Sequence, residues 1–505
     1  MSDASVRVAL RSDKPLVVIE APAGCGKTHQ GADYACEMAG TGNGRLLILT
    51  HTHAACSVFA ERTRGVGSCV EIRTIDSLVG QIAAAYHVGL GLPADAAAWA
   101  RRNKDGYAHL AAKVAALLDR HPMIAVALAH RYPIVVCDEH QDCSGDQHAI
   151  GIALHRRGTR LRVFGDPIQR IYKSKTLGGG QPAADWESLV RSASAFEELD
   201  TPHRWKDGCG ELGDWTLRAR QTLKGGGRLD LTRNLPRSVE VVIAENQARR
   251  YGDYQLASGD RRPIDAFERA HDSLLILSHF ADTAQHLRAF FGRRLPLWEG
   301  HTRPALERLV EATIMHHGNA EQLAGALVTF MGDIGKGFTP SAFGDLLVRE
   351  TREGCVRSAT GKPAAVQAMA RRIFDAPDHR GIASALRLLA ELRGTNSAFA
   401  QVELDCHTEF WEAVRLGGHA DPDEGFAQIT HHRTHARPQP PSRAISTIHK
   451  AKGLECDGVI VMPCDAKTFP DTQEARCLLY VALTRAKRRL QFVVSRTAPS
   501  PLLAI

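Results

Sequence analysis

The sequence lacks several features that would assign it to a common class of protein. It has no long apolar run and no N-terminal signal pattern, which argues against membrane association and favours a soluble, cytoplasmic protein. Its 12 cysteines include no Cys-x-x-Cys pair, so we expect free thiols in a reducing compartment. Internal repeats are also missing, and a net charge of +7 is too small to predict nucleic-acid binding by itself.

The sequence does contain a glycine-rich turn between a strand pattern and a helix pattern. Residues 21–28 read APAGCGKT and follow the apolar run 16–19. Backbone N–H groups of such a loop and the N-terminus of the following helix converge on phosphate groups. Lys27 is predicted to reach the β- and γ-phosphates, and the Thr28 hydroxyl to bind Mg²⁺. The predicted nucleotide-binding residues of this loop are Ala23, Gly24, Cys25, Gly26, Lys27 and Thr28. A chance turn in a glycine-rich chain is the alternative, because Ala21 stands where the usual pattern begins with glycine.

A pair of adjacent carboxylates follows a second apolar strand pattern. Residues 134–137 read IVVC and lead into Asp138 and Glu139. In a P-loop ATPase, Asp138 would hold Mg²⁺ through water, and Glu139 would orient and deprotonate the attacking water. A solvated acidic turn explains this segment equally well when it is considered alone. The upstream glycine loop favours the ATPase interpretation.

Three further segments complete an ordered set of motifs. They read LRVFGDPIQ at 161–169, AISTIHKAKGLECDG at 444–458 and LLYVALTRAKRRL at 478–490. Together with APAGCGKT and DEHQD, they resemble the motifs of superfamily 1 helicases of the UvrD/Rep type and span nearly the whole chain. The resemblance implies an α/β fold with two RecA-like P-loop NTPase lobes, each a parallel sheet with flanking helices and a short helical insertion. It also implies ATP and Mg²⁺ as cofactors and DNA as a partner.

The resemblance assigns roles to individual residues around the nucleotide. Gln169 matches the residue that senses the γ-phosphate and couples it to the DNA path. Arg204 and Arg485 match two arginine fingers from the second lobe, although a surface charge is a plausible alternative for Arg204. Gly453 and Glu455 match the pair that meets the γ-phosphate and the ribose.

Other matches concern the DNA path. The segment Thr50, His51, Thr52 and His53 is similar to the family's TFTNKAA motif, and Thr74 begins a segment similar to TFHSL. Tyr172 matches an aromatic residue of the family, and His449 and Lys452 lie on the side of the fifth motif. Hydroxyls and backbone amides of this kind bind phosphates without recognising the base sequence. Ordinary loop histidines and a core tyrosine are the alternatives.

The sequence departs from the family in places that matter for binding. Residues 1–20 contain no glutamine to read the adenine base, although His203 could stack on it. His51 replaces a phenylalanine, and Ser174 to Thr176 replace an aromatic-Arg-Gly segment. Stacking on aromatic side chains contributes about 1–3 kcal/mol per base. These losses suggest that the chain binds single strands more weakly, or that its binding depends on a partner.

The motif spacing predicts four regions. Residues 1–84 and 131–205 form lobe 1A, and residues 206–295 and 443–505 form lobe 2A. Residues 85–130 are a short helical insertion of the 1B type. Residues 296–442 are a helical insertion of the 2B type with a proline-rich linker at 438–441.

The predicted function is that of an ATP-dependent helicase or translocase, moving 3′ to 5′ on single-stranded or partly duplex DNA in repair, recombination or anti-phage defence. A second possibility is a DNA-dependent ATPase subunit that regulates a nuclease, because compact UvrD-like chains resemble GajB, the half of Gabija defence that pairs with an OLD-family nuclease. A third is a small-molecule kinase or non-translocating NTPase. The DEHQD, KGLE and LTRAK segments argue against the third.

Overall fold

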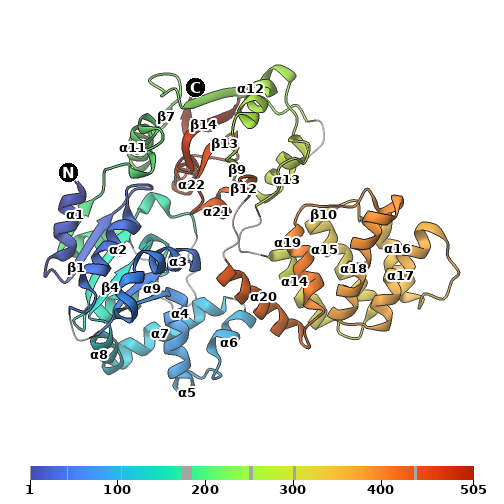
Figure 1. Cartoon of the computed structure of the whole chain (residues 1–505), viewed down its shortest axis with the longest axis horizontal. Helices are drawn as coiled ribbons and strands as arrows, with labels where there is room; N and C mark the ends of the chain where they lie inside the picture. Colours follow the sequence, from blue (N-terminus) through green and yellow to red (C-terminus); the bar gives the residue numbers. More distant parts are fainter. Residues whose placement is uncertain are drawn as a thin grey trace. The chain divides into compact units, whose positions relative to one another are not determined.

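The chain divides into two compact units. The computed structural model describes residues 2–41, 44–103, 105–172, 185–248, 254–298, 303–436 and 441–505 (Figure 1). The first unit comprises Met1–Phe280 and Thr447–Ile505, and the second comprises Ala281–Ser446. Residues 174–176 and 438–440, where the altered aromatic segment and most of the proline-rich linker were predicted, lie outside the described ranges.

The first unit begins with a parallel sheet whose strands are short runs of buried apolar residues. Their order is β3-β2-β4-β5-β1-β6, and every neighbouring pair is parallel. The strands are β1 (Leu16–Glu20), β2 (Leu46–Thr50), β3 (Val70–Thr74), β4 (Ile134–Cys137), β5 (Arg160–Gly165) and β6 (Ala195–Glu198). Parallel pairing brings all the carboxyl ends to one edge of the sheet, which is where ligands bind in open α/β folds.

Both faces of this sheet are covered, because alternate residues of its strands point to opposite sides. Val17 and Ile19 pack in one core with residues of α1 and α2, whereas Leu16 and Val18 pack in another with residues of α4, α7 and α9. The helices of this lobe are α1 (Ser2–Arg11), α2 (Lys27–Met38), α3 (His53–Arg62), α4 (Ile75–Ala85), α5 (His87–Leu90), α6 (Ala96–Arg102), α7 (Gly106–Arg120), α8 (Pro122–Arg131), α9 (Gly145–His155) and α10 (Trp186–Ser192). We call this sheet and its helices the first lobe.

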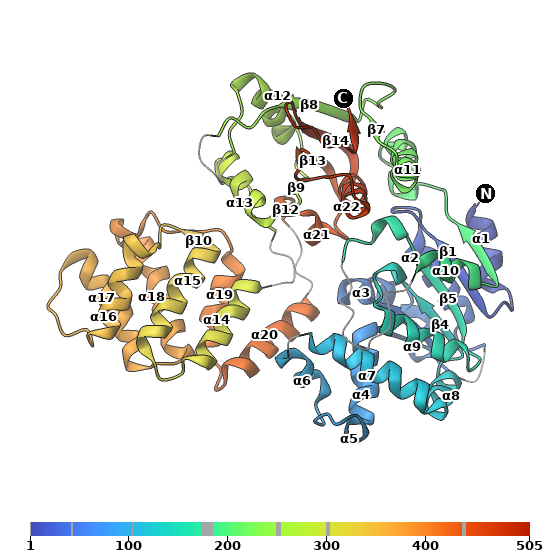
Figure 2. The ribbon, with the colours of Figure 1, turned by 180° about the vertical axis from the view of Figure 1, so that it is seen from behind.

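A second parallel sheet lies in the same unit. Its strands β9 (Leu274–Ser278), β13 (Cys456–Cys464), β14 (Ala486–Ser495) and β8 (Val239–Ala244) are neighbours in that order. β12 (Arg443–Thr447) spans the boundary between the two units. The accompanying helices are α11 (Gly210–Lys224), α12 (Ser258–Arg269), α21 (Ile448–Ala451) and α22 (Gln473–Leu483). α11 packs against α22 and touches β14, as Figures 1 and 2 show. We call this group the second lobe.

Short elements complete the first unit. β7 (Leu229–Asp230) pairs with β15 (Leu503–Ala504). The 3₁₀ turns are η1 (Arg64–Cys69), η2 (His140–Asp142), η3 (Pro167–Gln169) and η4 (His203–Trp205). The last three follow strand ends or lead into α11, so they carry polar side chains toward the carboxyl edge of the first sheet.

The second unit is helical and has its own core, which includes the fully buried Leu306, Leu327 and Leu386. Its helices are α13 (Ala281–Phe290), α14 (Pro304–Met315), α15 (Ala320–Ile334), α16 (Asp345–Arg352), α17 (Gly361–Asp375), α18 (His379–Thr395), α19 (His407–Leu416) and α20 (Pro422–Ala436). A two-residue antiparallel pair joins β10 (Gly335–Lys336) to β11 (Glu403–Leu404). A π-helical turn at Pro340–Gly344 precedes α16.

The predicted α/β class is confirmed, because two parallel sheets are flanked by helices. The limits of the four predicted regions stay predictions. Within the described ranges, we find no helix with the length and apolar character needed to cross a bilayer.

Candidate active site

The glycine-rich loop lies between β1 and α2 and adopts a conformation that requires glycine. Gly24 and Gly26 have φ angles of 76° and 83°, in the left-handed region that side chains disfavour. A Cβ atom added at Gly24 would lie 2.7 Å from the Trp205 ring. The carbonyl of Gly24 accepts a hydrogen bond from the Arg204 N–H at 3.0 Å, and the Ala23 N–H donates to the Tyr480 hydroxyl at 3.2 Å. The loop is therefore held by η4 and by α22 of the second lobe.

Lys27 begins α2 and reaches the carboxylates after β4. Its ammonium donates to Glu139 Oε1 and lies 3.5 Å from Asp138 Oδ1. Burial would lower the pKa of Lys27, but Asp138 and Glu139 outweigh burial and raise that pKa. The three residues that the sequence assigned to phosphate, magnesium and water thus lie in one place.

Asp138 fits a divalent cation on its own chemistry. It is 4% exposed, and its Oδ1 accepts no hydrogen bond from the described residues. Burial raises the pKa of Asp138 to about 6, although Lys27 acts in the opposite direction. Its nearest cation is the Lys27 ammonium, 3.5 Å from Oδ1, and a hard cation would compensate the buried carboxylate when Lys27 moves to a phosphate. The Thr28 hydroxyl, one residue along α2, is the predicted second contact.

Glu139 is held in an unusual backbone conformation. Its φ of 53° is in the left-handed region, which few residues with a side chain adopt. Gln141 Nε2 donates to Glu139 Oε2 at 2.5 Å, while Gln141 Oε1 accepts from the Asp166 N–H at 3.0 Å. Burial would raise the pKa of Glu139, but Lys27 and Lys452 outweigh it and lower that pKa. Glu139 therefore stays ionised, as a proton acceptor must be.

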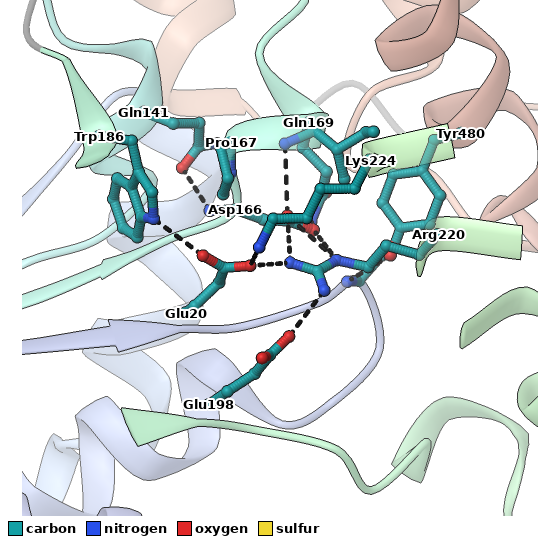
Figure 3. A network of polar contacts seen from close by, with 12 residues as sticks. Glu20, Gln141, Asp166, Pro167, Gln169, Trp186, Glu198, Arg220, Lys224 and Tyr480 are labelled. Atoms are coloured by element: carbon teal, nitrogen blue, oxygen red, sulfur yellow. Dashed lines mark hydrogen bonds and ion pairs between the residues drawn. The ribbon is translucent and has the colours of Figure 1, made fainter. Parts of the chain in front are cut away.

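Gln169 lies in η3 at the end of β5. Its side-chain amide donates to Asp166 Oδ2 at 2.7 Å, and Asp166 in turn accepts from Arg220 Nη2 at 2.9 Å (Figure 3). Its backbone carbonyl accepts from Lys452 Nζ at 2.9 Å. Gln169 is thus joined to the second lobe twice, through Arg220 and through Lys452.

The two predicted arginine fingers lie close together. Arg204 donates to the Thr484 carbonyl at 2.6 Å and to Glu455 Oε1 at 2.5 Å. Arg485 is 3% exposed and donates to the carbonyls of Val481 and Leu454 at 2.9 and 3.2 Å. Burial and the charge of Arg204 lower the pKa of Arg485 to about 10, so it remains charged at neutral pH.

The remaining predicted nucleotide contacts surround the same loop. The His203 ring lies over Gly26, where an added Cβ would be 3.1 Å from its Cδ2, and His203 Nε2 lies 2.7 Å from Asp3 Oδ2. Glu455 is the partner of Arg204, and Gly453 has a φ of 89° with open space around it. The roles of these residues toward base, ribose and phosphate stay predictions.

Threonines predicted to contact DNA act as helix caps. Thr52 and Thr74 accept hydrogen bonds from the N–H groups of Ala55 and Ser77, at the starts of α3 and α4. Thr447 caps α21 in the same way. The helices α3 and α4, which begin at the carboxyl ends of the parallel strands β2 and β3, therefore present N-termini, which attract phosphate. Thr50 differs, because it is buried and donates to the Thr52 carbonyl.

His51 points inward, whereas the adjacent His53 is exposed. His51 Nε2 lies 3.3 Å from Cys143 Sγ, and burial lowers the pKa of His51 to about 4. Cys143 also lies 3.5 Å from His140 Nδ1. Among the described residues, no group of three histidine, cysteine or acidic side chains is arranged to hold a metal ion.

A row of rings crosses the end of β9, and the sequence predicted only half of it. Tyr172 is 48% exposed, and its hydroxyl donates to the His449 carbonyl at 3.1 Å. His449 lies 5.8 Å from His279, which stacks on Phe280 at 4.2 Å and 15°. Phe280 is 37% exposed. Tyr172 and Phe280 offer the exposed π faces that bind single-stranded bases.

Lys452 is predicted to contact DNA, and in this structure its ammonium binds other residues of the chain. It donates to Asp142 Oδ2 at 2.5 Å as well as to the Gln169 carbonyl, and it lies 5.2 Å above the Tyr172 ring. It thereby joins the second lobe to η2 and η3 of the first.

Sequence reasoning missed seven residues of the site: Glu20, Gln141, Asp166, Arg220, Tyr480, His279 and Phe280. Gln141 and Asp166 stood inside recognised motifs, so their position was a usable signal. Arg220 lies in α11, where nothing in the sequence distinguishes it from the other arginines. The arrangement as a whole provides a phosphate loop, a cation site, a carboxylate base and two arginines, which suits phosphoryl transfer to water.

Comparison with known families supports this chemistry. Residues 96–176 match the UvrD/REP helicase N-terminal domain, and residues 443–493 match the UvrD-like helicase C-terminal domain. One segment is 30% identical over 123 residues to DNA helicase IV of Escherichia coli K12. That match covers 18% of this chain and 18% of the other protein, so the chain spans less than a fifth of this relative in the alignment.

Proposed function

Because this chain belongs to the UvrD/Rep-like family of helicases, we propose that it hydrolyses ATP and uses the energy to move 3′ to 5′ along single-stranded DNA. The observation that carries the proposal is the position of Lys27, which lies against Asp138 and Glu139 beneath the glycine loop. Two arginines support it: Arg204 in η4, just before α11, and Arg485, between α22 and β14.

In this proposal the loop from Ala23 to Thr28 binds the phosphates of ATP through its N–H groups and through Lys27. Thr28 and Asp138 would hold Mg²⁺, which neutralises phosphate charge and orients the scissile bond. Lys27 would move from Glu139 to the phosphate chain, because an anion of higher charge competes with a single carboxylate.

The release of Glu139 from Lys27 leaves it free to accept a proton from the attacking water. Gln141 keeps the other carboxylate oxygen in place through its bond to Glu139 Oε2. The water oxygen attacks the γ-phosphorus as its proton passes to Glu139, and ADP leaves with the electrons of the broken P–O bond. General base catalysis of this kind contributes about 10²- to 10⁴-fold to a rate.

Arg204 and Arg485 would stabilise the charge on the transferring phosphoryl group. Arg204 is bound to Glu455, so it must exchange that carboxylate for phosphate oxygens when ATP is present. Closure and reopening of the cleft between the two lobes would accompany this exchange and move the strand. DNA phosphates are proposed to bind at the starts of α3, α4 and α21, with bases against Tyr172 and Phe280.

The test is steady-state ATP hydrolysis by the purified chain with and without single-stranded DNA. We expect DNA to raise the rate and Lys27→Ala to abolish it. Glu139→Gln should bind ATP but hydrolyse it about 10²- to 10⁴-fold more slowly, because only the proton acceptor is removed. A Glu139→Gln variant that hydrolyses ATP at the wild-type rate would show that Glu139 is not the proton acceptor. Strand displacement from duplexes with either a 3′ or a 5′ tail would then test the direction.

A second candidate is a DNA-dependent ATPase subunit that regulates a nuclease and unwinds little by itself, as in anti-phage defence of the Gabija type. The inward position of His51 favours it, because the family's motif has a phenylalanine at this place and the inward imidazole offers no such ring for base stacking. ATP hydrolysis that stays weak with DNA, and rises only when a nuclease is added, would select this candidate. A DNA-stimulated rate with strand displacement would reject it.

A further inference from the structure

The Arg220 guanidinium binds carboxylates at the carboxyl ends of three neighbouring strands. Arg220 is 2% exposed, and it donates to Asp166 after β5, to Glu20 at the end of β1 and to Glu198 at the end of β6 (Figure 3). Strands β5, β1 and β6 are adjacent in the first sheet. The Arg220–Glu198 distance is 2.7 Å, and the Arg220–Asp166 distance is 2.9 Å.

Arg220 does not belong to the lobe whose carboxylates it binds. Its helix, α11, packs mainly against α22 and β14 of the second lobe, where Trp215 meets Phe492 with ring centres 6.2 Å apart, while Leu217 of the same helix also packs against the core of the first sheet. Trp205, just before α11, donates to the Ala486 carbonyl at the start of β14. Any displacement of the second lobe against the first sheet therefore acts on the Arg220 contacts.

Asp166 connects Arg220, through hydrogen bonds, to the groups proposed for hydrolysis. Its Oδ2 accepts from the Gln169 amide, and its N–H donates to Gln141, which holds Glu139. The path from the second lobe to the proposed γ-phosphate sensor thus has one intermediate residue, and the path to the proposed base has two. Each step is a hydrogen bond of 3.0 Å or less.

We propose that Arg220 is a positioning residue, which transmits the position of the second lobe to Gln169 and Glu139 through Asp166 and so couples DNA binding to hydrolysis. This rests on the proposed function, since it assigns a regulatory contact to the same site. An arginine suits the role because its planar, five-donor fork can serve several carboxylates at once, which a lysine ammonium cannot do with the same geometry.

The neighbouring Lys224 provides a matched control. It lies four residues further along α11 and binds Glu20, but no contact with Asp166 is found for it among the described residues. Its side chain is 43% exposed, compared with 3% for Arg220. Lys224→Gln therefore removes a cation from the same cluster and leaves the path through Asp166 intact.

The experiment measures ATP hydrolysis by the full chain with and without a thymidine homopolymer, together with the affinity for a fluorescent ADP analogue. In Arg220→Gln we expect the ratio of stimulated to basal rate to fall about tenfold or more, as for other residues that orient catalytic groups. The ADP affinity should be nearly unchanged, and Arg220→Lys should restore part of the ratio. Lys224→Gln should keep the wild-type ratio.

A double-mutant cycle tests the path itself. ATP hydrolysis is compared in the wild type, Asp166→Asn, Arg220→Lys and the double variant. Because this cycle does not use Arg220→Gln, it still tests the proposal if that variant does not fold. If Arg220 acts through Asp166, the second substitution adds little to the first. Multiplicative effects, an equal loss of basal and stimulated rates, or an unchanged ratio in Arg220→Gln would each overturn the proposal. A wild-type chain without DNA stimulation would instead refute the proposed function on which it rests.

Discussion

Replacing Gly24 by alanine tests the contact between the glycine loop and η4. The new Cβ would lie 2.7 Å from Trp205 Cζ3 and 2.8 Å from Arg204 Cβ, which is closer than carbon atoms pack. Trp205 cannot move aside easily, because it is fully buried and its indole N–H donates to the Ala486 carbonyl at 2.8 Å. Either the loop or η4 must shift, and both carry groups proposed to bind ATP.

The expected size of the effect follows from two terms. A left-handed φ costs a residue with a Cβ atom about 1–2 kcal/mol. Overpacking a close contact adds about 1–3 kcal/mol. Gly91→Ala is the matched control, since Gly91 lies in the left-handed region, with φ 63° and ψ 40°, but nothing lies within 4 Å of its added Cβ. The contact alone, about 1–3 kcal/mol, corresponds to a loss of about 5- to 150-fold.

The assay is kcat/KM for ATP in Gly24→Ala, Gly91→Ala and the wild type, with thermal unfolding measured for each. We expect Gly91→Ala to keep the wild-type kcat/KM and Gly24→Ala to reduce it by the factor given above. A folded Gly24→Ala with the kcat/KM of the control would refute the reasoning, because the loop and η4 would then separate at no cost.

Three further predictions concern single side chains. Phe280→Ala should weaken single-stranded DNA binding by about 1–3 kcal/mol in fluorescence anisotropy, and Phe374→Ala, which removes a 45% exposed ring of the helical unit, should not. Burial lowers the pKa of His51 from 6.5 to about 4, so between these pH values the unfolded chain binds a proton that the folded chain does not. The thermal stability should therefore decrease as the pH is lowered from 6.5 to about 4, and it should decrease less steeply in His51→Gln. Burial raises the pKa of the Cys25 thiol to about 12, so Cys25 should resist alkylation in the native protein while the half-buried Cys69 reacts, as peptide mass spectrometry would show.

The parts of the site that the sequence predicted are those built by local chain geometry. A strand, a glycine turn and a helix are contiguous, so the position of Lys27 follows from residues 16–28 alone. The approach of Lys27 to Asp138 could be expected too, because parallel strands bring their carboxyl ends to one edge. The fold class was implied by the resemblance of the ordered motifs to those of UvrD/Rep-type helicases.

Contacts between residues far apart in the chain were not predictable in this way. Arg220 lies 54 positions from Asp166 and 200 from Glu20, and no pattern links an arginine on a helix to those strand ends. Lys452 shows a different limit. The resemblance identifies its segment, but the direction of a flexible side chain depends on the neighbours it meets, here Asp142 and the Gln169 carbonyl.

Three cations of the site share one property that constrains how the proposed ATPase cycle starts. Lys27 is bound to Glu139, Arg204 to Glu455 and Lys452 to Asp142, so each cation already has a carboxylate partner inside the protein. A buried ion left without a partner is strongly destabilising, and these pairs avoid that state before ATP arrives. In the proposed mechanism, nucleotide binding therefore exchanges one ion pair for another at Lys27 and Arg204. Arg485 differs, because its guanidinium donates to the Val481 and Leu454 carbonyls and would gain a new ion pair with phosphate. On this proposal Glu139 becomes free to act as a base when Lys27 has left it.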